Sequence, residues 1–255
     1  MTTNLRPIVL ITGATSGFGL ATAKKFAQHG YPLIITGRRE SRLQALSAEL
    51  APLTKVYSSV LDVRDSDAVI AFSKQLPDAF KQIAILVNNA GLALGAEPAN
   101  EASLADWHTM IDTNVTGLVN ITHSLLDTLR AQPSASIINL ASVAASSAYP
   151  GSHVYGASKA FVAQFSRNLR CDFAGTGVRI TSLEPGLSES EFSLVRFKGD
   201  QQKYQQIYNN AHALQPEDIA NIIFWIAEQP AHININSLEV MPTSQAWDNF
   251  KIIKK

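Results

Sequence analysis

The sequence is poor in cysteine, in unbalanced charge and in long hydrophobic runs. Its single cysteine, Cys171, cannot form an intrachain disulfide, which fits a reducing compartment. Its 21 basic and 21 acidic residues cancel, so no broad positive field is available for nucleic acid. No run approaches the roughly 20 apolar residues that span a bilayer, and residues 1–7 lack the apolar region of a signal peptide. We therefore expect a cytoplasmic protein that binds neither membranes nor nucleic acid.

What the chain does have is a regular alternation of short apolar runs and longer helical patterns. Strands are predicted at residues 8–11, 33–36, 55–61, 83–87, 136–140, 178–183 and 238–241, and helices at 17–28, 39–50, 66–74, 104–129, 154–173 and 216–228. Because the strands are continuously apolar, we expect burial on both faces, which is typical of a parallel sheet. The alternation implies right-handed crossovers. We predict a single-domain α/β fold, a doubly wound parallel sheet of about seven strands with helices on both faces.

The domain is predicted to span residues 1–243, since no internal repeat or low-complexity linker interrupts them. Within it, residues 187–213 show no clean period and are predicted to form a mobile loop with short helices. Residues 244–255 are polar and basic at their end, so we expect a loose C-terminal tail.

A glycine-rich turn, GATSGFG at residues 13–19, joins the first predicted strand to the first predicted helix. Glycines allow a sharp turn and a close approach to a pyrophosphate, and the helix that follows offers free N–H groups and a positive dipole end. The spacing is G-x3-G-x-G and not the usual G-x-G-x-x-G, so a tight turn without a ligand is the alternative. Its place directly after the first strand favours dinucleotide binding.

Two arginines end the second strand, where a dinucleotide fold distinguishes its cofactors. An acid there binds the adenosine ribose hydroxyls, whereas a basic residue accommodates a 2′-phosphate. Arg38 and Arg39 stand here, and no carboxylate occurs before Glu40. We therefore predict NADP, held by charge-assisted guanidinium bonds; the alternative is a solvated helix start with Glu40 and Arg42 paired. Asp62, after the third strand, could accept from the adenine amino group or cap a helix.

Tyr155 and Lys159 have the spacing of two side chains that act together. They lie four residues apart in a predicted helix, so both lie on one face. An ammonium there can stabilise a phenolate, and a phenol with a lowered pKa can exchange protons with an alcohol or ketone near neutral pH. Ser142 lies thirteen residues before Tyr155, after an apolar strand. Taken singly, each has a structural alternative, as a surface pair or as a turn or cap residue.

Together these motifs resemble the short-chain dehydrogenase/reductase family. The matching elements stand in the family's order and spacing over about residues 8–242: Thr12 to Gly19, Asn88-Asn89-Ala90-Gly91, Asn114, Ser142, Tyr155-x3-Lys159 and Pro185-Gly186. Further segments resemble the NADP-dependent 3-hydroxy acid dehydrogenases: NNAGLALGAEP at 88–98, EPGL at 184–187, EFSLVRFKGD at 191–200, PAHININ at 230–236 and Met241-Pro242. Members of that subgroup oxidise serine, L-allo-threonine and related 3-hydroxy acids, and some reduce malonic semialdehyde.

The resemblance implies a Rossmann-like catalytic domain and a role for each matching side chain. Tyr155 would be the general acid/base, Lys159 would favour the phenolate and hold the nicotinamide ribose, and Ser142 would fix the substrate oxygen. Asn114 would hold a water that links Lys159 to solvent. The implied cofactor contacts are Gly13, Thr15, Ser16, Gly17, Phe18, Gly19, Arg38, Arg39, Asp62, Val63, Asn89, Tyr155, Lys159, Pro185, Gly186 and Ser190. No metal is expected, since the six histidines show no metal-ligand spacing.

A 3-hydroxy acid brings a carboxylate, which needs a cation or a helix terminus. Arg196 lies in the 187–213 loop, which could close over the substrate, and we predict that it pairs with this carboxylate; the alternative is a solvent-facing residue. The subgroup usually carries a threonine after Pro-Gly that contacts the nicotinamide carboxamide. This chain is one residue shorter there, so Ser190 takes that place, or Ser188 does. Tyr149 is interpreted as a packing residue.

Three functions stay open at this point. The first is an NADP-dependent 3-hydroxy acid dehydrogenase, with a small molecule as substrate. The second keeps the fold but acts on a neutral ketone, a diketone, a sugar or an acyl-carrier substrate. The third is a dinucleotide-binding regulator without turnover. The resemblance also implies a homotetramer, with helical faces around residues 104–129 and 154–173 buried between subunits.

Overall fold

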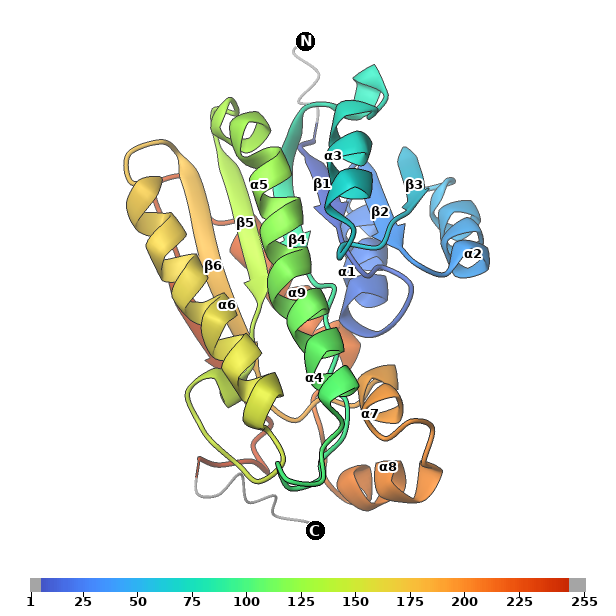
Figure 1. The fold of residues 1–255 in the computed structure, drawn as a ribbon. Helices are drawn as coiled ribbons and strands as arrows, with labels where there is room; N and C mark the ends of the chain where they lie inside the picture. The colour runs from blue at the N-terminus through green and yellow to red at the C-terminus, as the bar shows by residue number, and fades with distance from the viewer. Residues whose placement is uncertain (1–5, 248–255) are drawn as a thin grey trace.

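The computed structural model describes residues 6–247, and within them seven parallel strands form one sheet (Figure 1). The strands are β1 (Ile8–Ile11), β2 (Leu33–Gly37), β3 (Val56–Val60), β4 (Ile83–Asn88), β5 (Ala135–Leu140), β6 (Val178–Pro185) and β7 (Ser237–Val240), in the order β3-β2-β1-β4-β5-β6-β7. Strands β1, β2, β4, β5 and β6 are buried along their whole length, as continuous apolar runs predict. The predicted doubly wound α/β fold is confirmed.

Helices cover both faces of this sheet. The described helices are α1 (Gly17–Gln28), α2 (Glu40–Leu50), α3 (Ser66–Lys74), α4 (Leu104–Ile111), α5 (Gly117–Arg130), α6 (His153–Asp172), α7 (Glu191–Arg196), α8 (Gln201–Tyr208) and α9 (Pro216–Ala227). Side chains of α1, α2 and α9 pack on one face of the sheet, and those of α3, α5 and α6 pack on the other. Short 3₁₀ turns lie at Asp78–Phe80 and Val143–Ala145. Figure 1 places α4, α7 and α8 at the end toward which the strands point.

The long helical region predicted over residues 104–129 is present as α4 and α5, with one irregular turn between them. A π-helical turn, Asp112–Thr116, separates α4 from α5. The extra residue in this turn turns the buried Asn114 side chain toward the main chain of Leu92, with which it makes two hydrogen bonds. Gly117 then lets α5 pass close to Val63, since a Cβ there would lie 2.4 Å from the valine Cγ2. Both residues serve contacts with distant segments, so the local sequence pattern does not reveal the π-helical turn.

The sheet order reverses between β1 and β4, because β2 and β3 extend the sheet on one side of β1 and the later strands extend it on the other. At such a point the loops after the strands diverge and leave a crevice beyond the carboxyl ends, where open α/β sheets bind ligands. Strand β6 continues two residues beyond its predicted end, because Glu184 and Pro185 pair with Glu239 and Val240 of β7. This extension brings the Pro185-Gly186 turn to the same crevice.

Two absences apply to residues 6–247. No helix among them has the length and apolar character needed to cross a bilayer. Nor does that part of the chain hold a group of three or more His, Cys, Asp or Glu side chains arranged as metal ligands.

Candidate active site

A cavity of about 470 Å³ lies along the carboxyl ends of the strands. It extends from the arginines after β2 to Arg196 at the end of α7. Seventeen of the predicted site residues line it: Gly13, Thr15, Ser16, Gly17, Phe18, Arg38, Arg39, Asp62, Val63, Asn89, Ser142, Tyr155, Lys159, Pro185, Gly186, Ser190 and Arg196. Gly19 and Asn114 do not line it, and their contributions are indirect.

The glycine-rich turn forms one wall of the cavity. Gly13 and Gly17 have φ values of +65° and +50°, which favour glycine. Gly19 lies against the main chain, and a Cβ there would come within 2.4 Å of the Gly13 carbonyl oxygen. The three glycines therefore let the first turn of α1 and the loop before it fold tightly, which leaves the helix N-terminus open toward the cavity.

The side chain of Asn89 shapes this turn from the neighbouring strand. Its Nδ2 donates to the carbonyl oxygens of Thr12 (2.8 Å) and Gly13 (3.1 Å). The Thr12 hydroxyl in turn accepts from the backbone N–H groups of Asn89 and Ala90. We predicted Asn89 as a cofactor contact; its amide nitrogen is used within the protein, although the residue lines the cavity. Asn88 is structural, since its Nδ2 donates to two buried side chains.

Arg38 and Arg39 lie at the end of the cavity next to β2, and they differ in their contacts with the protein. The Arg38 guanidinium makes no hydrogen bond or ion pair with any residue in the described part of the chain. The Arg39 guanidinium donates to the hydroxyls of Thr15 (2.8 Å) and Ser16 (2.7 Å) and pairs with Glu191 (3.1 Å). The free guanidinium of Arg38 thus fits a phosphate best, while Arg39 is already oriented by its neighbours.

Asp62 has a partner that the sequence did not suggest. Arg64 donates three hydrogen bonds to its carboxylate, the shortest at 2.6 Å. These bonds hold the pKa of Asp62 below its ordinary value. The carboxylate lines the cavity in its charged form and keeps lone pairs for a further donor.

Ser142, Tyr155 and Lys159 meet at the centre of the cavity, and all three are buried. The Ser142 hydroxyl donates to the carbonyl oxygen of Pro185 at 3.4 Å and caps the 3₁₀ turn that follows it. The Lys159 Nζ donates to the carbonyl oxygen of Leu140 at 2.7 Å. It lies 5.9 Å from the centroid of the Tyr155 ring.

The pKa of Tyr155 shifts in the direction opposite to the one expected from its spacing to Lys159. Burial, more than any other cause, raises the pKa of Tyr155, and a hydrogen bond with Ser142 opposes this shift only in part. Burial lowers the pKa of Lys159 to about 8. The expected lowering of the tyrosine pKa by Lys159 is therefore not found in the protein alone. The ammonium is directed to the Leu140 carbonyl, and the phenol is desolvated.

Asn114 supports the site from behind. Its Oδ1 accepts from the N–H of Leu92 at 2.8 Å, and its Nδ2 donates to the Leu92 carbonyl oxygen and to the Ser158 hydroxyl. Asn114 Oδ1 and Lys159 Nζ both lie near Gly91, where a Cβ would be 3.2 Å and 3.4 Å from them. Its predicted role in holding a water stays a prediction.

Arg196 lies at the other end of the cavity, next to Tyr155. Its Nε donates to the carbonyl oxygen of Gly95 at 3.0 Å and its Nη1 to the Tyr149 hydroxyl at 3.1 Å. Its Cζ is 5.9 Å from the centroid of the Tyr155 ring. Tyr149, which we interpreted as packing, lines the cavity and orients Arg196. The side chain of Arg196 thus faces the site and not the solvent.

The turn after β6 is contacted by Gln245, a second residue that the sequence did not indicate as part of the site. Gln245 lies in the predicted loose tail, yet its Oε1 accepts from the N–H of Leu187 at 2.7 Å and lies beside Gly186. Ser188 donates to the Gly186 carbonyl oxygen, whereas Ser190 lies beside Gly17 of the glycine-rich turn. Residues 244–247 make side-chain contacts with the rest of the domain, and the remainder of the predicted tail, 248–255, lies outside the described residues.

Known proteins share the sequence and the fold of this chain. The family model described as "short chain dehydrogenase" matches residues 7–200. The chain is 58% identical over 246 residues to "Sulfoacetaldehyde reductase 2" of Chromohalobacter salexigens, covering 96% of this chain and 98% of that one. It is 52% identical to "Serine 3-dehydrogenase" of Agrobacterium fabrum, covering 97% and 98%. A solved structure, "The Closed form of serine dehydrogenase complexed with NADP+", superposes with a TM-score of 0.92 at 49% identity, covering 97% of this chain and all of that one.

Proposed function

The chain belongs to the short-chain dehydrogenase family and is an NADP-dependent oxidoreductase, and from that premise we propose that it acts on a small 3-hydroxy acid. The proposed reaction transfers a hydride between NADP and the carbon that bears the alcohol or carbonyl. The observation that supports this substrate class is Arg196, a cation oriented toward the catalytic tyrosine from within the cavity.

The residues of the cavity fit a dinucleotide phosphate. The positive-φ glycines leave room beside the N-terminus of α1, and the free guanidinium of Arg38 suits a 2′-phosphate. Gly186 has no space for a side chain, because a Cβ would lie 2.3 Å from Gln245 Oε1. When bound, NADP supplies the nicotinamide carbon that accepts or donates the hydride.

Tyr155 would give a proton to the substrate oxygen in reduction and take one in oxidation. Its burial keeps the phenol protonated, so it is ready to act as the acid. Ser142, hydrogen-bonded to it, would hold the same substrate oxygen in place. Lys159, with a pKa of about 8, is mostly charged at neutral pH and would favour the phenolate that remains after proton transfer.

Arg196 would bind the acidic group of the substrate. Its Nε and Nη1 are used by Gly95 and Tyr149, which fix the plane of the guanidinium. Among residues 6–247, none accepts a hydrogen bond from Nη2, which is therefore available to an anion. Such a fixed guanidinium selects for geometry as well as charge.

A sulfonate analogue is the second candidate, because the chain is 58% and 57% identical to two proteins named sulfoacetaldehyde reductases. Sulfoacetaldehyde and a 3-oxo acid share one feature: a single carbon separates the carbonyl carbon from the anionic group. The same guanidinium could therefore receive a carboxylate or a sulfonate.

The test is a screen of initial rates with NADP or NADPH, and with NAD or NADH. The substrates are serine, 3-hydroxybutyrate, sulfoacetaldehyde and a neutral secondary alcohol. We expect the acids to be preferred, and Arg196→Ala to raise their KM about tenfold or more without changing that of the neutral alcohol. An unchanged KM for the acids in the variant would remove Arg196 from this role. Cofactor binding without turnover of any substrate would favour a regulator.

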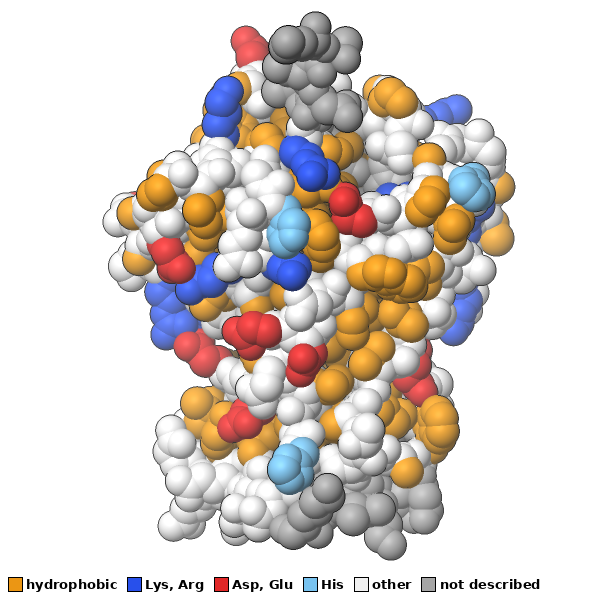
Figure 2. All heavy atoms as spheres, turned by 180° about the vertical axis from the view of Figure 1, so that it is seen from behind, with side chains coloured by type: hydrophobic (Ala, Val, Ile, Leu, Met, Phe, Trp, Pro, Cys, Tyr) orange, Lys and Arg blue, Asp and Glu red, His pale blue; other side chains and the backbone are white. Residues whose placement is uncertain are grey.

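We also propose a homotetramer. Phe161 and Phe165 of α6 stack on each other, and Phe161 is 39% exposed. Figure 2 shows hydrophobic side chains on the opposite face, and Trp225 of α9 is 52% exposed. Apolar surface on two faces suits more than one subunit contact. Light scattering in solution tests this, and a monomeric mass at micromolar concentration would contradict it.

A further inference from the structure

The substrate loop, residues 187–213, is fixed at the substrate end of α7 by several contacts. The backbone N–H of Gly95 donates to the Arg196 carbonyl oxygen at 2.9 Å, and the Arg196 side chain returns a bond to Gly95. Lys198, two residues after the end of α7, pairs with Asp106 of α4 at 2.7 Å. This end of the loop is thus attached to the wall that carries the substrate cation.

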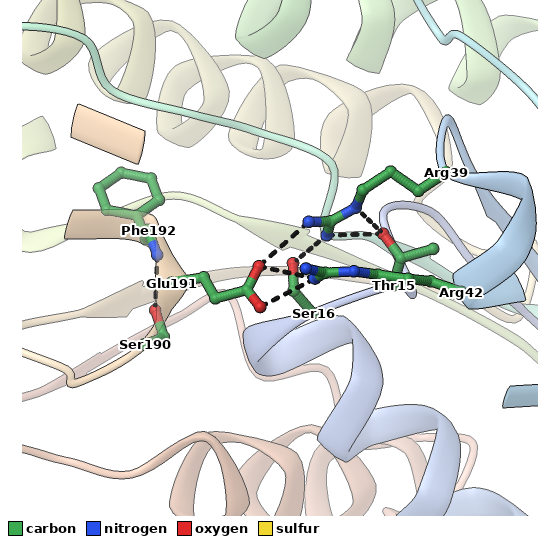
Figure 3. Close-up of polar contacts among 7 residues, drawn as sticks. All are labelled: Thr15, Ser16, Arg39, Arg42, Ser190, Glu191 and Phe192. Carbon is green, nitrogen blue, oxygen red and sulfur yellow. Dashed lines mark hydrogen bonds and ion pairs between the residues drawn. The ribbon is translucent and has the colours of Figure 1, made fainter. Parts of the chain in front are cut away.

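The other end of α7 is attached to the cofactor wall by one side chain. Figure 3 shows the Glu191 carboxylate between two guanidiniums, that of Arg42 in α2 and that of Arg39, the residue before α2. Arg42 donates to both carboxylate oxygens, at 2.8 and 2.9 Å, and Arg39 donates at 3.1 Å. Burial alone would raise the pKa of Glu191, but these hydrogen bonds outweigh it and hold the pKa below its ordinary value.

We propose that Glu191 is a positioning residue that holds the substrate loop closed by linking α7 to the arginines beside the 2′-phosphate site. This proposal rests on the proposed function, since it takes Arg38 and Arg39 as the phosphate-binding residues. Glu191 itself contacts neither reacting group. Because α7 begins at Glu191 and ends at Arg196, the attachment at its first residue also places the cation at its last.

The charges explain how a carboxylate can remain beside a phosphate. Arg38, Arg39 and Arg42 carry three positive charges, and Glu191 carries one negative charge. A 2′-phosphate dianion of about two negative charges would make the group neutral. Arg38 makes no hydrogen bond or ion pair among residues 6–247, so the phosphate would have a guanidinium that Glu191 does not use. Glu191 and the phosphate would share only Arg39, and Arg42 would stay with the carboxylate.

This arrangement predicts that removing the charge of Glu191 weakens the apparent binding of the acid substrate without weakening that of NADPH. In Glu191→Gln the loop loses its two charged attachments, so the KM for the acid substrate should rise about threefold to tenfold, as expected for two partly exposed ion pairs. The dissociation constant for NADPH should stay the same or fall, because an anion near the phosphate has gone. A variant that is merely misfolded would weaken both.

Limited trypsin digestion gives a readout that needs no turnover. The loop contains cleavage sites at Arg196, Lys198 and Lys203. With NADPH bound, we expect Glu191→Gln to be cut there about threefold to tenfold faster than the wild type. Glu189→Gln is the matched control, because it makes the same charge change in the same loop but contacts Tyr204 and Gln215 instead of the arginines.

The remaining outcomes separate the two proposals. Arg42→Met should raise the KM similarly, and the double variant with Glu191→Gln should raise it by less than the product of the single effects. Equal cleavage of Glu191→Gln and wild type at saturating NADPH would overturn the role of Glu191 while leaving the proposed function intact. A wild-type protein that does not bind NADPH would overturn both.

Discussion

Replacing Lys159 with methionine should make the protein more stable while abolishing turnover. Lys159 is only 6% exposed, and its ammonium donates a hydrogen bond to a neutral group, the Leu140 carbonyl oxygen. No ion pair with a carboxylate occurs for it within residues 6–247. Burial of an unpaired charge disfavours the folded state, and methionine retains the chain length without the charge.

The magnitude follows from the pKa of Lys159, which burial lowers from 10.5 to about 8. The difference, 10.5 − 8 = 2.5, corresponds at 1.36 kcal/mol per pH unit to about 3 kcal/mol. The folded pKa is the lower one, so this destabilisation is complete below pH 8 and fades as the pH rises toward 10.5. Loss of the bond to Leu140 costs about 1 kcal/mol. Lys159→Met should therefore gain about 2 kcal/mol at pH 7.

The assay is urea unfolding at pH 7 and at pH 9, with Lys74→Met, a change at an exposed lysine of α3, as the control. Lys159 should give the wild type about 1 kcal/mol of extra stability between these pH values, and Lys159→Met should lack this increment. A variant that is less stable than the wild type at pH 7, or that keeps the full pH dependence, would show that the lysine is not carried as a buried charge.

Three further predictions concern the cofactor and the proton. Gly19→Ala should weaken NADPH binding at least tenfold by titration calorimetry, because the new Cβ meets the Gly13 carbonyl oxygen at 2.4 Å; unchanged affinity would show that the turn relaxes freely. Arg38→Ala should raise the dissociation constant of NADPH about tenfold and leave that of NADH within twofold, and an equal change in both would exclude a 2′-phosphate contact. Because the pKa of Tyr155 is raised, alcohol oxidation should accelerate with pH through the alkaline range while carbonyl reduction does not. An oxidation rate that is flat from pH 7 to 10 would contradict this.

The sequence predicted the sheet well because burial on both faces leaves a local signal. A strand such as Ile83–Asn88 is continuously apolar until its last residue, and its bounds can be read without knowledge of its neighbours. The glycine-rich turn is equally local, since its positive φ angles require glycine at fixed positions. The central trio of the site followed from spacing together with the family resemblance.

The parts of the site that the sequence did not indicate depend on contacts between distant segments. Gln245 and Leu187 are 58 residues apart, and Arg42 and Glu191 are 149 apart. A glutamine in a polar tail and a glutamate at a helix start have no pattern that distinguishes them from solvated residues. Tyr149 was missed for the opposite reason, since an aromatic residue near the core is usually a packing residue.

The directions of the two central pKa shifts decide which state of the site the protein itself favours. Tyr155 and Lys159 are both buried, and burial favours the neutral form of each. For the tyrosine this is the protonated phenol, which can act as an acid without prior ionisation. For the lysine the shift to about 8 still leaves the ammonium predominant at neutral pH. The protein therefore presents a neutral acid beside a cation, which is the arrangement that carbonyl reduction requires at its start. Oxidation of an alcohol would need the phenol to lose its proton first, so the raised pKa of Tyr155 suits the phenol better to act as an acid than as a base at neutral pH.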